Sequence, residues 1–116
     1  MISFILEYSR FTIDLSPLII DQPEDNLDNQ YIYRNLVKDF RSIKDTRQII
    51  VATHNSTILV NSGCENVVIQ ESNHEQTWTD KTGYSKQKEI IRRIINILEG
   101  GVEAFQHKGR IYRDNI

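Results

Sequence analysis

Two short apolar runs, each stopping abruptly at a polar loop, constrain the fold of this chain more than any other feature. The first is Leu18-Ile19-Ile20, which stops at Asp21, and the second spans residues 48–53 and stops at His54. Short continuous apolar runs are typical of strands that are covered on both faces. Between the runs, apolar side chains recur at three- and four-residue intervals and predict a helix over residues 30–44 with one buried stripe. That stripe consists of Tyr33, Leu36, Val37, Phe40 and Ile43.

Strand, helix and strand in succession predict an α/β fold, because a parallel return requires a crossover and crossovers are usually helical. We expect a mainly parallel sheet flanked by helices. A brief helical turn at residues 57–60, ended by Gly63, leads to a third strand at residues 66–70. The loops after the first two strands then open at one edge of the sheet, which brings Asp21 and His54 into one neighbourhood.

The remaining segments predict smaller elements. Residues 2–8 have the pattern of the last turns of a buried helix, and residues 73–82 predict an added strand or a small hairpin. Ser85 can cap a helix that runs to about Glu99 and stops at Gly100-Gly101. Residues 102–108 predict one more short helix, and the tail after it is expected to fray. The buried stripe of the longer helix is Ile91, Ile94, Ile95 and Leu98.

The bulk properties favour one ordinary globular domain. A chain of 116 residues with 39% hydrophobic and 26% charged residues can bury one core but is small for a complete nucleotide-hydrolysing enzyme. The net charge of -2 provides no general attraction for nucleic acid. The single Cys64 excludes an internal disulfide and fits a reducing cytoplasm, and no apolar run approaches the length of a membrane span.

The end of the first strand has the chemistry of a divalent-metal site. Four carboxylates lie within eight residues, namely Asp21, Glu24, Asp25 and Asp28. Asp21 closes the strand, so a rigid element holds its carboxylate, and Mg²⁺ usually takes only one or two oxygens from protein. His54, at the second strand end, can hydrogen-bond a phosphate oxygen or a water. The alternatives are an acidic turn that caps the next helix through Asp28 or Asn29, and a histidine with a purely structural hydrogen bond.

The stretch from Pro17 to Asn29, Pro-Leu-Ile-Ile-Asp-Gln-Pro-Glu-Asp-Asn-Leu-Asp-Asn, resembles the Walker B strand and D-loop of ABC-type ATPases of the SMC-like branch. Residues 49–55 are similar to the switch strand and H-loop of that family, with one helix between the two motifs as in the family. Residues 100–105 are similar to the C-terminal tail of the bacterial AAA-like, SMC-related ATPases that carry the Asp-Gln-Pro-Glu-Asp form. The resemblance covers residues 3–70 best.

The resemblance implies a role for each matching residue. It assigns Asp21 to the magnesium shell, Asp28 to the D-loop that communicates across a head-to-head dimer, and His54 to sensing the γ-phosphate. Gln22 departs from the family, because most ABC ATPases have the glutamate that polarises the attacking water at this position. A glutamine cannot accept a proton at neutral pH but can orient a water. Glu24 is the nearest carboxylate that can substitute as the base.

The sequence contains no Gly-x-x-x-x-Gly-Lys-Ser/Thr phosphate loop and no Leu-Ser-x-Gly-Gln signature motif. The resemblance therefore implies that residues 1–116 are a partial ATPase domain, a C-terminal lobe that is inactive by itself. Such a lobe uses ATP and Mg²⁺ only with an N-terminal Walker A lobe or a full-length relative. A second hypothesis is a non-enzymatic module that self-associates or binds such a relative. A third, a metal-dependent nuclease, lacks a second strand-borne carboxylate.

Overall fold

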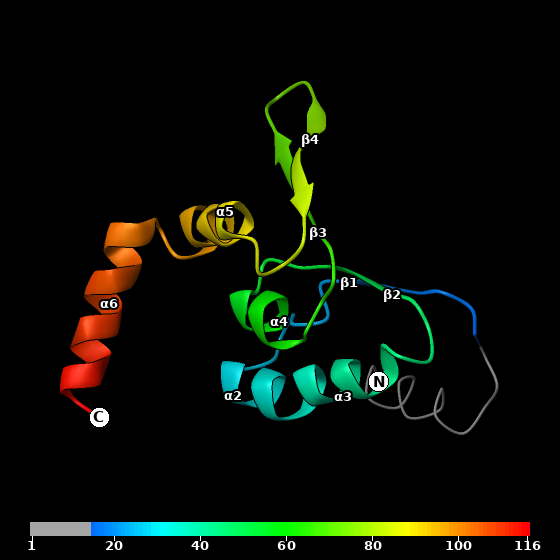
Figure 1. Cartoon of the computed structure of the whole chain (residues 1–116), viewed down its shortest axis with the longest axis horizontal. Coiled ribbons are helices and arrows are strands. Elements are labelled where there is room, and N and C mark those ends of the chain that lie inside the picture. Colours follow the sequence, from blue (N-terminus) through cyan, green and yellow to red (C-terminus); the bar gives the residue numbers. More distant parts are fainter. Residues whose placement is uncertain (1–14) are drawn as a thin grey trace. The chain divides into compact units, whose positions relative to one another are not determined.

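A computed structural model of the chain describes residues 15–116 (Figure 1). The chain divides into two compact units, Met1–Gly63 and Cys64–Ile116, and each has its own strands and helices. The helix predicted at residues 2–8 lies outside the described residues.

The first unit has the predicted strand, helix and strand. Strands β1 (Leu18–Asp21) and β2 (Ile49–Ala52) pair in parallel, with Leu18 opposite Ile49 and Asp21 opposite Ala52. A continuous helix connects them, made of α2 (Asn29–Tyr31), the π-helical segment η1 (Ile32–Leu36) and α3 (Val37–Ile43). The short helix α4 (Ser56–Asn61) follows β2 and ends before Gly63, whose φ is +71°.

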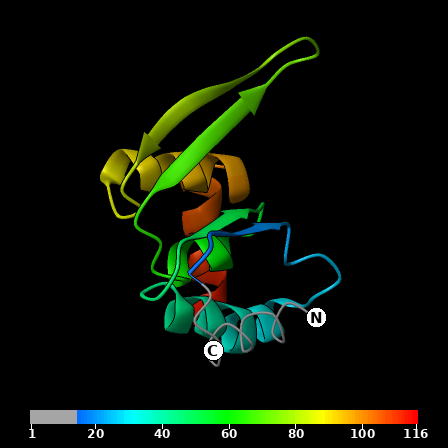
Figure 2. The ribbon, with the colours of Figure 1, turned by 90° about the vertical axis from the view of Figure 1, so that its right-hand side faces the viewer.

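The core of the first unit lies between this helix and one face of the sheet (Figure 2). The predicted stripe is confirmed except at its start, where Ile32 is buried and Tyr33 is 58% exposed. Ile32 lies four residues before Leu36 and Tyr33 lies three before it, so both positions fit a helical period, and the fully apolar Ile32 is the one that is buried. The residues that form this core are Ile32, Leu36, Val37, Phe40, Ile43 and Ile58, with Leu18, Ile20, Ile49 and Val51 packed against them.

The other face of the parallel sheet is exposed. Ile19 and Ile50 are opposite each other in the register, and they are 75% and 46% exposed. The expectation that both faces of these strands are covered is therefore wrong for this structure. The side chains alternate between a face packed on the helix and a face in solvent, and the solvent face is also apolar except at Asp21.

In the second unit, the predicted third strand does not extend the parallel sheet. Strand β3 (Val67–Ser72) pairs antiparallel with β4 (Thr77–Gly83) as a hairpin, whose turn is fixed by Asn73. The Asn73 Oδ1 accepts from the backbone N–H groups of Glu75 and Gln76 at 2.8 and 2.7 Å. The α/β class is correct, but the described residues form one parallel and one antiparallel two-stranded sheet instead of a mainly parallel one. A local apolar run cannot specify its partner strand, and here the nearest strand in sequence was the partner.

Helix α5 (Lys88–Leu98) covers one face of the hairpin, and their buried residues are Val67, Ile69, Ile90 and Ile94. The stripe predicted for this helix did not include Ile90, which is buried. Ser85 does not cap this helix, because its hydroxyl donates to the carbonyl of Cys64 at 2.6 Å and the N-cap is Gln87.

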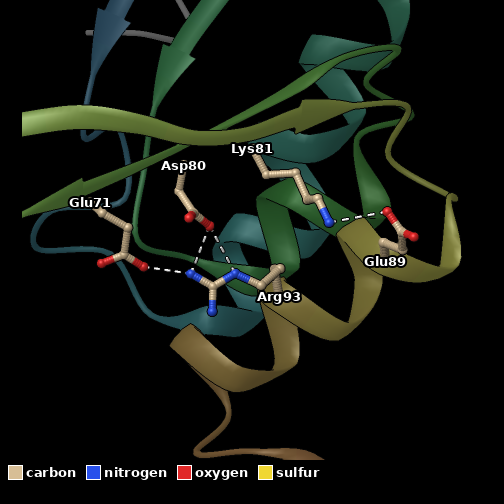
Figure 3. Close-up of polar contacts among 5 residues, drawn as sticks. All are labelled: Glu71, Asp80, Lys81, Glu89 and Arg93. Atoms are coloured by element: carbon tan, nitrogen blue, oxygen red, sulfur yellow. Dashed lines mark hydrogen bonds and ion pairs between the residues drawn. The ribbon is translucent and has the colours of Figure 1, made fainter.

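Charged side chains also tie the hairpin to α5 (Figure 3). Arg93 donates to Glu71 at 2.5 Å and to Asp80 at 3.1 Å, and Lys81 pairs with Glu89 at 3.1 Å. Asp80 and Lys81 are adjacent, yet both reach α5, because β4 contains a bulge. Ile69 is opposite Lys81 and Gln70 is opposite Thr79, so Asp80 is an extra residue in the ladder.

Gly100 and Gly101, with φ of +80° and +105°, end the helical run as predicted. The helix after them, α6 (Val102–Asp114), is longer than expected, and the predicted fraying after residue 108 is wrong. A lone Gly109 weakened the helical signal without breaking the helix. Among the described helices, none has both the length and the apolar character that a membrane span requires.

Candidate functional site

The ends of β1 and β2 lie at one edge of the parallel sheet. The pairing continues one residue past the strands, because the Gln22 N–H donates to the Ala52 carbonyl at 2.7 Å. The loops that carry Asp21 and His54 therefore leave the sheet side by side, as the order of elements predicted.

Glu24 joins the two loops directly. Its Oε2 accepts from the Thr53 hydroxyl at 2.7 Å and from the His54 backbone N–H at 2.9 Å. Its other oxygen, Oε1, is buried and has no hydrogen-bond partner among the residues that the structure describes. Buried carboxylate oxygens rarely remain unpaired, so this atom has spare capacity to accept a hydrogen bond or to bind a cation.

A chain of polar contacts continues from Glu24 to the helix starts. Thr53 Oγ1 also accepts from the Asn55 N–H at 3.0 Å, and Asn55 caps α4 by accepting from the Ile58 N–H at 3.1 Å. The Asn55 amide also donates to the Asn29 side chain at 3.1 Å. The sequence reasoning did not identify Thr53, Asn55 or Asn29 as site residues, although an Asn directly before a helical turn is an N-cap signal.

The backbone of the first loop takes a compact shape with two unusual conformations. Gln22 and Asn26 have φ of +49° and +65°, which non-glycine residues adopt rarely. Two turn hydrogen bonds hold the loop, from Asp25 N–H to the Gln22 carbonyl at 3.3 Å and from Leu27 N–H to the Glu24 carbonyl at 3.0 Å. Strained positions that persist are often found at functional sites, and Gln22 is the position where the sequence departs from the ABC pattern.

The four carboxylates of the first loop differ in their surroundings. Asp21 is exposed at the strand end, and Asp25 is exposed on the loop. Asp28 accepts from the Tyr31 N–H at 2.8 Å and so caps the helix, which confirms the predicted capping contact. Of these four described carboxylates, only Glu24 forms hydrogen bonds with the second loop.

The His54 side chain is exposed, and its contact with the site is through its backbone N–H. The ring is therefore available to a ligand at this edge. Within residues 15–116, no group of three or more His, Cys, Asp or Glu side chains is arranged to hold a metal ion.

The chain was compared with known proteins at three levels. No protein-family model, no curated protein and no solved structure matches it.

Proposed function

We propose that this chain is the C-terminal lobe of an ABC-type, SMC-like ATPase, contributing the Walker B, D-loop and H-loop part of an ATP site. The observation that carries the proposal is the contact of Glu24 with Thr53 and His54 at the ends of two parallel strands. It brings together the two sequence motifs on which the resemblance rests. In the assembled ATPase, β1 and β2 would belong to a larger parallel sheet.

The residues of this edge have distinct roles in the proposed site. Asp21 binds Mg²⁺, His54 contacts the γ-phosphate through its exposed ring, and Asp28 anchors the D-loop to its helix. Bound Mg²⁺ neutralises the charge of the phosphates. Gln22 orients the attacking water. Glu24 is a candidate base by its position in the loop, but among the described residues its Oε2 already accepts two hydrogen bonds and its Oε1 is buried, so neither oxygen is open to an attacking water in this structure.

The exposed sheet face supports the need for a partner lobe. Ile19 and Ile50 present an apolar surface that the described residues leave uncovered. A Walker A lobe or a full-length relative, in the cytoplasm, would cover this face and supply most contacts to ATP. The isolated chain is then expected to bind ATP weakly and to hydrolyse none.

ATP turnover tests this proposal. The purified chain should show no turnover by itself, and addition of a Walker A-bearing N-terminal lobe should restore it. Asp21→Asn should reduce the restored rate by about a hundredfold or more, since metal binding is worth several kcal/mol in the transition state. Asp25→Asn, an equal charge change on the same loop, should not. Robust turnover by the chain without a partner would contradict the missing-lobe idea.

The same exposed face favours a second function, a non-enzymatic module that self-associates or binds a relative. Two such sheets can pack through Ile19 and Ile50, or can pair edge to edge. Light scattering at high concentration distinguishes the possibilities, because a strictly monomeric chain would exclude self-association.

A further inference from the structure

The helix that connects β1 and β2 has a basic pocket on its surface. Arg34, Lys38 and Arg41 line this shallow, open pocket together with Tyr33 and Val37. Val37 is buried and forms an apolar floor, whereas the Tyr33 ring is 58% exposed at the rim. All five residues belong to the first unit.

The three cations of this pocket have no ion-pair partners in the part of the chain that the structure describes. None of Arg34, Lys38 and Arg41 has an ion pair or a side-chain hydrogen bond within residues 15–116, and no acidic side chain of that range lines the pocket. Arg93, in contrast, is a paired cation, since it contacts the carboxylates of Glu71 and Asp80. Neighbouring unpaired cations repel one another, so an anion at this pocket would relieve that repulsion.

The spacing of the cations suits an extended anion. Positions 34, 38 and 41 follow one side of the helix over a rise of about 10 Å, so an extended anion that carries several charges can contact all three side chains. The exposed Tyr33 ring beside them can stack on a base. Tyr33 and Arg34 also lie in the π-helical segment, a distortion that is frequent at functional sites.

We propose that Tyr33, Arg34, Lys38 and Arg41 form a binding site for single-stranded nucleic acid. The cations contact successive phosphates and Tyr33 stacks on one base. The net charge of the whole chain, -2, gives no general attraction, so binding depends on this local cluster and on low salt. The site needs neither ATP nor a partner lobe, and therefore does not depend on the proposed ATPase function. An acidic peptide could use the cations but not the aromatic ring.

Fluorescence anisotropy of the full chain with a labelled single-stranded oligonucleotide of about 12 nucleotides tests the site. The triple variant Arg34→Gln, Lys38→Gln, Arg41→Gln should lose at least about tenfold in affinity in 50 mM salt, since each phosphate contact adds counterion release. The slope of log K against log salt should fall from about -2 to about zero. The matched control Lys86→Gln, Lys88→Gln, Arg92→Gln removes the same charge from exposed positions of the second unit and should bind within about twofold of the parent.

The proposed stacking of Tyr33 on a base can be tested separately from the phosphate contacts. Tyr33→Leu should lower the affinity at least about fivefold without changing the salt slope, whereas Tyr84→Leu, another half-exposed tyrosine, should not. Circular dichroism confirms that each variant is folded. Equal losses in the matched control would overturn the proposal. So would poly-glutamate binding as tightly as the oligonucleotide with no effect of Tyr33→Leu, a result that identifies an acidic protein segment as the partner.

Discussion

Glu24 connects two loops that lie 30 residues apart in the sequence. Sequence reasoning could identify the acidic cluster, because four carboxylates follow an apolar run. It gave them different roles but did not predict that Glu24 contacts the second loop, since that depends on how the first loop turns at Gln22 and Asn26, both with positive φ. Thr53 was missed for the same reason, because its hydroxyl donates to Glu24 across 29 residues of sequence. Asn55 carries a local N-cap signal that was not used.

Replacing Glu24 tests the connection between the loops. Glu24→Ala should lower the free energy of unfolding by about 1–3 kcal/mol, because the Thr53 hydroxyl and the His54 N–H lose a charged acceptor. The His54 amide should also exchange faster with solvent. Urea denaturation and hydrogen exchange measure the two effects. The exposed Asp25→Ala on the same loop serves as the control, and an equal loss in both variants would argue against the contact.

Asn26 provides a second test at this scale. Its φ of +65° suits asparagine and glycine but costs most other residues about 1–2 kcal/mol. Asn26→Gly should therefore leave the stability nearly unchanged, while Asn26→Ala should reduce it by about 1 kcal/mol. Thermal unfolding of the two variants compares them, and an alanine variant as stable as the glycine variant would contradict the left-handed conformation.

Among the elements, periodicity predicted the helices well and strand partners poorly. The stripe from Leu36 to Ile43 and the stop at Gly100-Gly101 are encoded locally, and both are present. The pairing of β3 with β4 is not local information, and the run Val67-Val68-Ile69 is equally compatible with a parallel strand. Tyr33 was misplaced because positions 32 and 33 both fit the helical spacing to Leu36, and periodicity alone does not choose between them.

The cap of the long helix can be tested by Asp28→Ala. The loss of the hydrogen bond to Tyr31 N–H should cost about 1 kcal/mol of stability, as at other helix N-caps. Asp28→Ser and Asp28→Asn keep an acceptor and should retain most of the stability. Urea denaturation with the exposed Asp25→Ala on the preceding loop as the comparison checks whether position 28 is special.

Arg93 ties α5 to the hairpin, and its pKa gives the expected pH behaviour. Partial burial acts to lower the pKa of Arg93, but the hydrogen bonds and charges of Glu71 and Asp80 outweigh it, so the pKa lies above its ordinary value. A raised pKa contributes stability that is complete below the unfolded value and is lost only as pH rises through the folded value. The guanidinium contribution should therefore stay constant between about pH 6 and pH 9.

The variant Arg93→Ala should increase amide exchange in β3 and β4, because two carboxylates lose their partner. The neighbouring, exposed Arg92→Ala should not have this effect. The difference between the two variants should shrink in about 1 M salt, where charge interactions are screened. If Arg93→Ala exchanged like its neighbour, the network would not hold the hairpin.

At the scale of the whole molecule, each unit has its own sheet and its own buried residues. The continuous apolar runs led us to expect strands covered on both faces, and the structure supplies cover for one. The difference is informative, because the apolar character of Ile19 and Ile50 is encoded in the sequence although the described residues leave both exposed.

Association through this face is the prediction at this scale. If the chain self-associates, the double variant Ile19→Thr, Ile50→Thr should shift it towards monomer, since threonine keeps the β-propensity but removes apolar surface. Val60→Thr with Val68→Thr, two other exposed apolar positions, is the matched control. Light scattering over a range of concentrations measures the shift, and equal behaviour of both variants would place the contact elsewhere.

The bulge at Asp80 has a consequence for changes in chain length. Deleting Asp80 would leave Lys81 opposite Ile69 and Thr79 opposite Gln70 in an uninterrupted ladder. Deleting Thr79 or Lys81 would instead put Asp80 into the ladder in place of the lost residue. Deleting a β4 residue further from the bulge would shift part of the ladder and turn side chains to the opposite face. A one-residue deletion is therefore best tolerated at Asp80, where it removes one of the two carboxylates on Arg93 but preserves the register of the whole hairpin.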